Sequence, residues 1–429
     1  MARARRREEG DLSQTRVGVS LPQRNGARPP SRAGSEASTR ARLTADESRG
    51  VTTSSERRTS PVELLWDLVF VFAVTQVSTL LSHDLSWGGL GRALLALALV
   101  WWAWSAFVWV ANAQDPDEPA MRGALVVAMV LIFIAGLALP EAFGEHGLLF
   151  ASTYAGVRVL HLVLYADASR RGRASWSAIT GFAVTVLVGM ALLVGGSFLE
   201  GGHRVATWAL AAAIDYAGPA WLTRERLRGL QPVAVAHFAE RYSLFIIICL
   251  GESILAIAVG VNAAHLGRGS LGVAALALLM TVGLWWTYFD RFAATAEERL
   301  RHHREPVLAA ADAYSYLHLL LVAGIIVFAV GAKATLAHVD RPLEAGPRLA
   351  LCGGVALYLI GHVAFQRRLL GTLVHEELVA AGAACALGVL GTHLPAWSIA
   401  LGLTLLLAAL VALASFPSSF TVRPSRRAP

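Results

Sequence analysis

The chain is poor in the residues that mark many functional classes. It has 3 cysteines among 429 residues. Cys249, Cys352 and Cys385 all lie within apolar segments, and no two of them form a CxxC pair. This spacing argues against a structural zinc site or a disulfide framework and predicts small core-packing residues. Lys333 is the single lysine, so arginine provides nearly all the positive charge.

Catalytic motifs are also missing. The sequence contains no HExxH, no GxSxG, no P-loop and no GxGxxG set between a strand and a helix. His302 and His303 lie near Glu297, Glu298 and Glu305, but a solvated loop is the better interpretation of that stretch. We therefore expect no enzyme, no metal site and no cofactor. A formal charge of +7 does not by itself indicate nucleic-acid binding, because membrane proteins carry basic cytoplasmic loops.

Long apolar segments are what the chain has in abundance. Hydrophobic residues make up 55% of the sequence and charged residues 16%, and apolar stretches recur from Glu63 to Ser415. This composition predicts an all-α polytopic membrane helical bundle with about twelve transmembrane helices. The first span begins at Ser60, and the others are predicted at about 90–112, 122–143, 147–166, 175–197, 203–222, 236–261, 269–291, 306–333, 347–366, 377–393 and 396–415.

The predicted regions follow from these segments. Residues 1–58 are expected to be a disordered basic cytoplasmic tail, and 416–429 a second cytoplasmic tail. The first sixty residues contain no apolar stretch, so the first span is expected to direct membrane insertion. Residues 59–235 and 236–415 are predicted to form a first and a second membrane repeat of six spans each.

The two predicted repeats share features in the same order. Trp101-Trp102 and Trp285-Trp286 each precede a charged inner loop, while Tyr154 and Tyr358 each lie in a span that ends in paired arginines. An even number of spans per repeat predicts an axis along the membrane normal. Basic residues concentrate in alternate loops, which predicts cytoplasmic N- and C-termini in the bacterial inner membrane. The loop 112–122 is acidic and departs from this pattern.

Ionisable residues within the spans are the candidate site residues, and the stretch 237–260 is central among them. It carries Glu240 and Arg241 near its start and Glu252 deep in an apolar run. Arg241 and Glu252 share a helix face, but eleven residues rise about 16 Å, so direct contact is not expected. The full candidate set is Asp67, Arg158, His161, Asp215, Glu240, Arg241, Glu252 and Asp312.

Helical spacing relates some of these residues to each other. Tyr154, Arg158, His161 and Tyr165 share one stripe, and Asp312 is expected to share a face with Ser315 and Tyr316. Such groups suit a proton relay or a site for a charged solute. The alternative is that they form buried ion pairs that fix helix register. The tryptophans Trp101, Trp102, Trp104 and Trp109 are predicted to form an interfacial belt rather than an aromatic cage.

Several segments resemble the bacterial low temperature requirement protein A family. They are PVELLWDLVFVFAVTQVS, WWAWSAFVWVANAQDPDEPAMR, LPEAFGEHGLLFA, DYAGP and HFAERYSLFIIICLGESILAIAVG. The resemblance covers most of residues 60–330 and implies a multi-pass membrane protein linked by name to growth in the cold. The residues that match its motifs, without an assigned chemical role, are Glu63, Asp67, Asp115, Asp215, Glu240, Arg241 and Glu252.

Two functions remain open at this level. The first is a secondary transporter or permease for an unidentified small solute or ion, with proton coupling as one option. Its expected titrating groups are Glu252 and Asp67, with Arg241 and Arg158 as counter-charges or anion ligands and His161 as a relay. It predicts that Asp67, Arg158 and Glu252 face a common polar cavity. The second is a non-transporting stress-adaptation or assembly factor whose buried charges are structural. In both cases the lipid bilayer is the expected partner.

Overall fold

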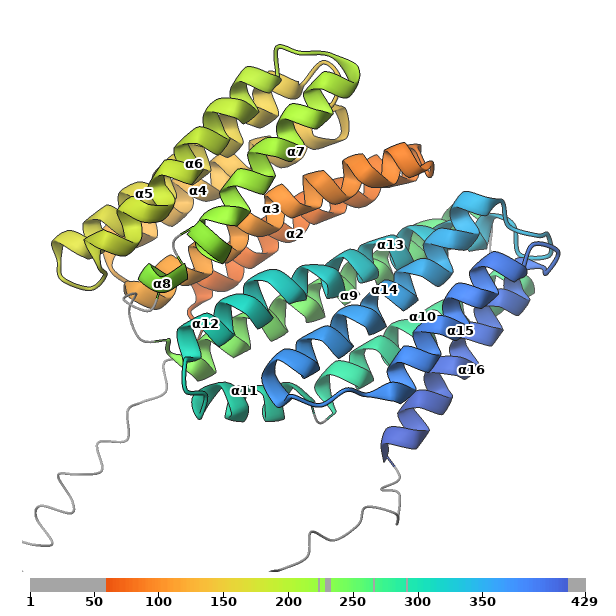
Figure 1. Cartoon of the computed structure of the whole chain (residues 1–429). Helices are drawn as coiled ribbons and strands as arrows, with labels where there is room; N and C mark the ends of the chain where they lie inside the picture. Colours follow the sequence, from red (N-terminus) through yellow and green to blue (C-terminus); the bar gives the residue numbers. More distant parts are fainter. Residues whose placement is uncertain (1–58, 223, 228–232, 265–266, 291, 416–429) are drawn as a thin grey trace, which may run out of the picture. The chain divides into compact units, whose positions relative to one another are not determined.

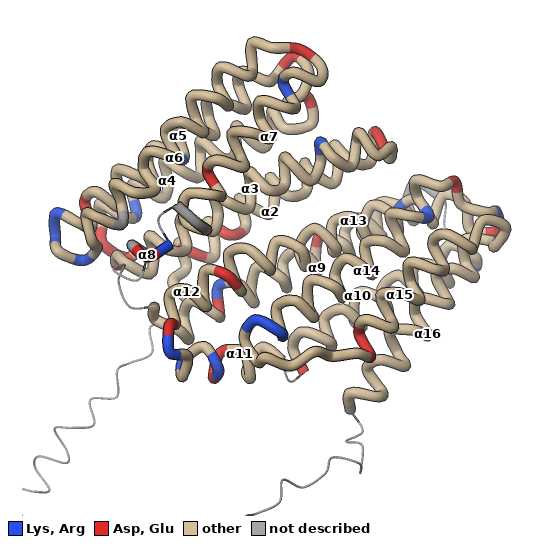
Figure 2. The backbone as a smooth tube through the Cα atoms, in the orientation of Figure 1, with Lys and Arg blue, Asp and Glu red and all other residues tan. Residues whose placement is uncertain are grey.

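A computed structural model describes residues 59–222, 224–227, 233–264, 267–290 and 292–415. Within these residues the chain is helical and forms no strand (Figure 1). Charged residues lie mostly at the ends of the long helices (Figure 2). The predicted tails, 1–58 and 416–429, lie outside the described residues.

The helices follow one another with short connections. Those of the first half are α2 (Pro61–His83), α3 (Trp87–Ala113), α4 (Pro119–Ala138), η1 (Leu139–Glu141), α5 (Gly147–Arg170), α6 (Trp176–Gly196), α7 (Gly201–Ala217), η2 (Gly218–Leu222) and α8 (Arg224–Leu227). Those of the second half are α9 (Val235–Ala264), α10 (Arg268–Phe289), α11 (Phe292–Arg301), α12 (Pro306–Ala310), η3 (Ala311–Leu317), α13 (His318–Ala337), α14 (Ala345–Leu370), α15 (His375–Leu390) and α16 (Ala396–Ser415).

A helix stands at each of the twelve predicted spans. Ten helical segments in the described part are long and apolar enough to cross a membrane. The two segments below that length are α7, which the π-helix η2 extends, and α15. The predicted inner loop 291–305 contains a further helix, α11, which buries Phe292, Ala296 and Leu300 at a spacing of one turn. This is a multi-pass helical membrane protein.

The start of α2 is fixed by a capping box. The Ser60 hydroxyl accepts a hydrogen bond from the Glu63 backbone N–H at 3.4 Å, and Glu63 Oε2 accepts one from the Ser60 N–H at 2.9 Å. Pro61 occupies the first turn, where no N–H is required. The cap therefore sets the position of Glu63 on the helix before any tertiary contact forms.

Each half has its own set of neighbouring helices. In the first half, α2 packs against α3 and α4, α4 against α5, α5 against α6, and α6 against α7. In the second half, α9 packs against α10 and α13, α13 against α14, α14 against α15, and α10 against α16. The halves meet where α2 and α3 pack against α9 and α13.

The closest helix pair in the second half is α13 with α14. A Cβ added to Gly324 would lie 2.5 Å from the Tyr358 backbone nitrogen, and one at Gly354 would lie 2.3 Å from that of Phe328. Only glycine allows the two backbones to approach in this way, as at other packed helices in membranes.

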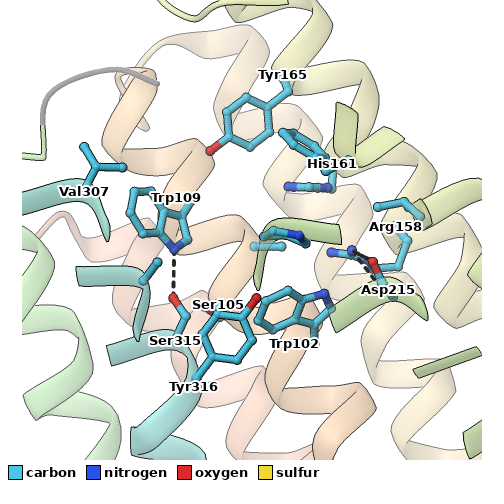
Figure 3. Close-up of a pocket in the computed structure, with 15 residues that line it drawn as sticks. Trp102, Ser105, Trp109, Arg158, His161, Tyr165, Asp215, Val307, Ser315 and Tyr316 are labelled. Atoms are coloured by element: carbon cyan, nitrogen blue, oxygen red, sulfur yellow. Dashed lines mark hydrogen bonds and ion pairs between the residues drawn. The ribbon is translucent and has the colours of Figure 1, made fainter. Parts of the chain in front are cut away.

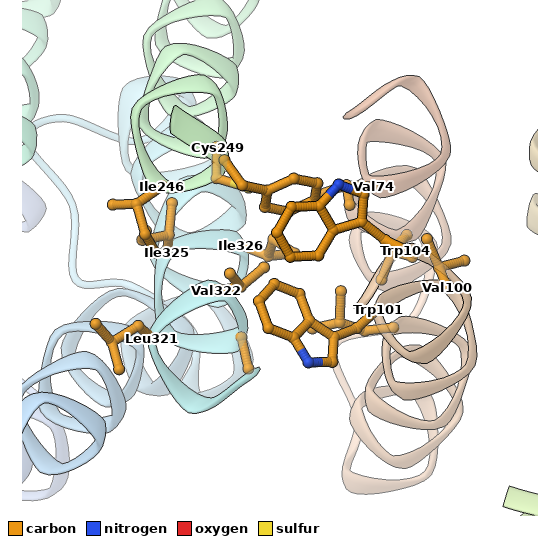
Figure 4. Close-up of a cluster of buried hydrophobic side chains, with 14 of the residues drawn as sticks. Val74, Val100, Trp101, Trp104, Ile246, Cys249, Leu321, Val322, Ile325 and Ile326 are labelled. Carbon is orange, nitrogen blue, oxygen red and sulfur yellow. The ribbon is translucent and has the colours of Figure 1, made fainter. Parts of the chain in front are cut away.

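The tryptophans of α3 are not an interfacial belt, so that prediction is wrong for three of the four. Trp101, Trp102 and Trp104 are buried, and Trp109 is half-buried. Figure 4 shows Trp101 and Trp104 extending from α3 towards α9 and α13. Burial is tolerated because the indole N–H of Trp101 donates to the Ser315 carbonyl at 2.7 Å. The tryptophans thus fill the junction between the halves.

The cysteine prediction holds in part. Cys249 and Cys352 are buried as expected, whereas Cys385 lies on an exposed face of α15.

Candidate functional site

A buried charge cluster joins the two halves at α2 and α9. It consists of Glu63 and Asp67 from α2, Trp104 from α3, and His237 and Arg241 from α9. Arg241 donates to Glu63 Oε1 at 2.8 Å and to both oxygens of Asp67 at 2.5 and 3.1 Å. The Trp104 indole donates to Asp67 Oδ1 at 2.8 Å, and His237 Nε2 lies 3.2 Å from Glu63.

This charge cluster is closed to solvent, since the exposed fraction of each of its five side chains is 2% or less. Two carboxylates face one guanidinium, and protonation of His237 would make the cluster neutral. Charges at this depth are tolerated only when they are paired and hydrogen-bonded, and Asp67 has both forms of support. The arrangement is suited to hold α2 against α9.

A second polar group surrounds a cavity of about 70 Å³. Arg158 and His161 of α5, Asp215 of α7, Ser105 of α3 and Ser315 of η3 lie along its wall. Figure 3 shows Trp109 and Ser315 on one side and Arg158 with Asp215 on the other. We call it the central cavity because both halves of the chain contribute to it.

The predicted stripe on α5 directs its polar residues towards the central cavity. Arg158 Nη2 donates to both oxygens of Asp215, at 2.7 and 2.9 Å, and both side chains are about 2% exposed. Three nitrogen atoms nevertheless lack a hydrogen-bond partner, namely Arg158 Nε, Arg158 Nη1 and His161 Nδ1. Buried polar atoms are normally satisfied, so these three are available to hold a bound solute or water.

Hydrogen bonds link the wall of the central cavity to α9. The Tyr242 hydroxyl lies 2.7 Å from Ser105 Oγ and 3.0 Å from Ser315 Oγ. The Trp109 indole donates to Ser315 Oγ at 2.9 Å. Tyr242 directly follows Arg241 of the charge cluster, so the two polar regions are neighbours along one helix.

Two π-helical segments border the central cavity, one from each half. Pro219 lies in η2, and Ser315 and Tyr316 lie in η3. π-Helical turns are rare and occur often at functional sites. The expected shared face divides: Ser315 and Tyr316 line the cavity, whereas Asp312 does not, because its carboxylate is held by Arg224 and Arg368.

Glu252 lies in a third region, separate from the charge cluster and the central cavity. It accepts a hydrogen bond from the Thr75 hydroxyl of α2 at 2.8 Å and interacts electrostatically with Lys333 of α13. It does not line the central cavity. Asp67, Arg158 and Glu252 therefore point to three separate places, and the prediction of one cavity shared by them is wrong. The reason is that contacts across the junction of the halves fix Asp67 and Glu252.

The remaining candidates lie outside these regions. Asp312 accepts two hydrogen bonds from Arg224 at 2.7 Å and one from Arg368 at 2.9 Å, and all three side chains are partly exposed. This contact ties α8 to α14. Glu240 lies on an exposed face of α9, turned away from the charge cluster.

Some residues of these sites were not singled out from the sequence. His237 precedes Arg241 by four residues, just as Glu63 precedes Asp67. Two helices that each carry ionisable residues one turn apart are a recognisable signal for pairing. A further buried set consists of His362, Gln366 and Glu377, in which His362 Nδ1 lies 2.8 Å from Glu377 Oε2. No group of three or more metal-ligating side chains occurs among the described residues.

The sequence matches the family described as bacterial low temperature requirement A protein over residues 58–412. The chain belongs to this family. The chain is also similar to an uncharacterized protein of Rhizobium meliloti (strain 1021), which is 34% identical over 324 residues, covering 73% of this chain and 78% of the relative. No solved structure matches the chain. The family match spans the charge cluster, the central cavity and Glu252.

Proposed function

We propose that the chain is a secondary transporter or permease of the bacterial cytoplasmic membrane, and that its solute binds in the central cavity. The observation that carries this proposal is the set of buried, unpartnered nitrogens of Arg158 and His161 on a cavity wall. If the ion pair between Arg158 and Asp215 only stabilised the fold, there would be no reason for a cavity beside it. Convergent polar groups in an aromatic-lined cavity are typical of small-molecule sites.

The proposal includes a six-plus-six repeat. Helices α2, α3, α4, α5, α6 and α7 correspond in order to α9, α10, α13, α14, α15 and α16, and the pairs that pack together in one half also pack in the other. A shared hydrogen bond supports the correspondence. Tyr154 of α5 donates to the Leu99 carbonyl of α3 at 2.9 Å, and Tyr358 of α14 donates to that of Leu284 of α10 at 2.8 Å.

The proposal also retains cytoplasmic termini. The acidic loop 112–122 is the apparent exception to the distribution of positive charge, and its contacts support placing it with the basic loops. Glu118 forms ion pairs with Arg171 and Arg173 of the loop 169–175. The charge of the acidic loop is thus compensated by its neighbour on the same side.

The residues have different roles in this proposal from those expected at first. Arg158 and His161 bind the solute, and Asp215 orients Arg158. The ion pairs of Arg241 with Glu63 and Asp67 hold α2 against α9, and the outer helices move relative to this fixed junction. The π-helical segments η2 and η3 are the places where the helices can change register with little loss of backbone hydrogen bonding.

Cysteine accessibility tests this proposal without knowledge of the solute. The three native cysteines are replaced by alanine, and Ala106→Cys places a thiol on the cavity wall. Alternating access predicts that a membrane-impermeant thiol reagent reacts from each side of the membrane in turn. Ala103→Cys, fully buried on the same helix and away from the cavity, is the matched control and should remain unreactive. Absence of labelling at position 106 from both sides would remove the transport proposal.

The second candidate is a non-transporting membrane factor, and the charge cluster favours it. Every carboxylate oxygen of Asp67 is paired, as expected for charges that only fix the fold. This candidate predicts that position 106 stays unlabelled and that substitutions in the charge cluster reduce folded yield without any effect on solute movement.

A further inference from the structure

The chemistry of the central cavity narrows the class of solute, an inference that rests on the proposed transport function. Its polar wall presents N–H groups more than acceptors. Arg158 offers two nitrogens without partners, while Asp215 already accepts two hydrogen bonds from the same guanidinium. Ser315 Oγ accepts the Trp109 indole N–H. A solute that satisfies Arg158 must therefore be an acceptor, and the positive charge of the guanidinium favours an anion.

The size of the cavity limits that anion. An apolar cavity of about 150 Å³ holds one benzene molecule, and a water occupies about 30 Å³ of liquid. The central cavity, at about 70 Å³, therefore has room for about two or three non-hydrogen atoms. Formate has this size, nitrate and acetate each exceed it by one atom, and benzoate is far larger.

Charge balance then requires a proton. With His161 neutral, Arg158 and Asp215 cancel and the cavity carries no net charge. Entry of a monoanion would leave one uncompensated negative charge in a buried site, which is costly. One proton on His161 restores neutrality, and the charge of the bound anion offsets the repulsion between that proton and the neighbouring Arg158 guanidinium.

The surroundings of His161 contain few competing groups. Its aromatic neighbours include Phe107 of α3 and Phe182 of α6, and α4 has no ionisable side chain between Gly123 and Ala138. The charged and titratable groups that line the same cavity are Arg158, Tyr165, Asp215 and Tyr316.

We infer that the central cavity binds a small monoanion on Arg158 together with one proton on His161. Transport by this route is electroneutral, since one anion and one proton move together. The substrate class is therefore a small monocarboxylate or an oxyanion of the same size and charge.

Titration calorimetry on the purified chain in detergent tests the inference. Formate is titrated at neutral pH in buffers of different ionisation enthalpy, which gives the number of protons taken up with the anion. We expect formate to bind with uptake of about one proton. Phosphate and benzoate, which are too highly charged or too large, should give no heat of binding.

Two variants separate the role of Arg158 in anion binding from the role of His161 in proton uptake. Arg158→Gln combined with Asp215→Asn removes the charge pair and leaves no unpaired charge, so the fold should survive while affinity falls at least tenfold. His161→Gln should abolish proton uptake and weaken anion binding. The melting temperature of each variant without anion shows that it is folded.

The possible failures are distinguishable. Binding without proton uptake, uptake that persists in His161→Gln, or wild-type affinity in the charge-free pair would each overturn the inference. If no small anion binds but the Ala106→Cys variant is labelled from both sides, the anion class is wrong and the transport proposal stands. If neither binding nor labelling occurs, both fail.

Discussion

Arg241 in the second half of the chain donates to both carboxylate oxygens of Asp67 in the first half, 174 residues earlier. The contact is fully buried and is shared with Glu63. It is therefore the clearest single link between α2 and α9. Its disruption should affect stability more than any other single change in the candidate set.

Arg241→Met is expected to destabilise the protein by about 3–5 kcal/mol, because it leaves two buried carboxylates without their cation. Equilibrium unfolding in mixed micelles measures the change. The triple variant Glu63→Gln, Asp67→Asn and Arg241→Met removes all these charges and should recover most of the lost stability. If the triple variant is no more stable than Arg241→Met, unpaired charge is not the cause.

Glu252→Gln is expected to have a small effect, less than about 1 kcal/mol, because the amide oxygen still accepts the Thr75 hydroxyl. Glu252→Leu should cost more, since it leaves that hydroxyl without its acceptor. Neither variant should change labelling of Ala106→Cys, because Glu252 does not border the central cavity. Loss of labelling in Glu252→Gln alone would return Glu252 to the transport mechanism.

Asp312→Asn should lower stability by about 1–2 kcal/mol through weaker contacts with Arg224 and Arg368. The value is moderate because all three side chains are partly exposed and solvent screens them. Thermal unfolding at low salt and at about 1 M salt provides the check. The difference between variant and wild type should shrink at high salt, and an unchanged difference would argue against an electrostatic origin.

The contact between the loops 112–122 and 169–175 should depend on pH. The pKa of Glu118 lies below its ordinary value, chiefly because Arg171 donates a hydrogen bond to its carboxylate. A lowered pKa means that the contact is present at neutral pH and is lost as the pH falls through that value. A spin label at Ser177→Cys in the cysteine-free chain should become more mobile on acidification.

Glu118→Gln is the control for that experiment. It should give the mobile spectrum already at neutral pH and no transition on acidification. A transition of the same size in this variant would assign the pH dependence to another group.

Local patterns predicted the helices well because each depends on neighbouring residues. The Ser60 cap and the stripe from Tyr154 to Tyr165 could be derived from spacing alone. Contacts across the junction of the halves could not be derived from spacing. Helical spacing predicts the face on which Glu252 lies but not which helix packs against that face. Thr75 is 177 residues away in sequence. The different environment of Asp312 escaped prediction for a related reason: its partners Arg224 and Arg368 are 88 and 56 residues away in sequence.

The link between Asp67 and Arg241 also has a consequence during synthesis. At about 5–20 residues per second, the ribosome makes Arg241 roughly 10–35 s after Asp67. Throughout that interval α2 carries two acidic side chains and no cation to receive them. The buried contact that joins α2 to α9 can therefore form only after most of the first half has been synthesised, and a chain truncated before Arg241 would leave Asp67 without its cation.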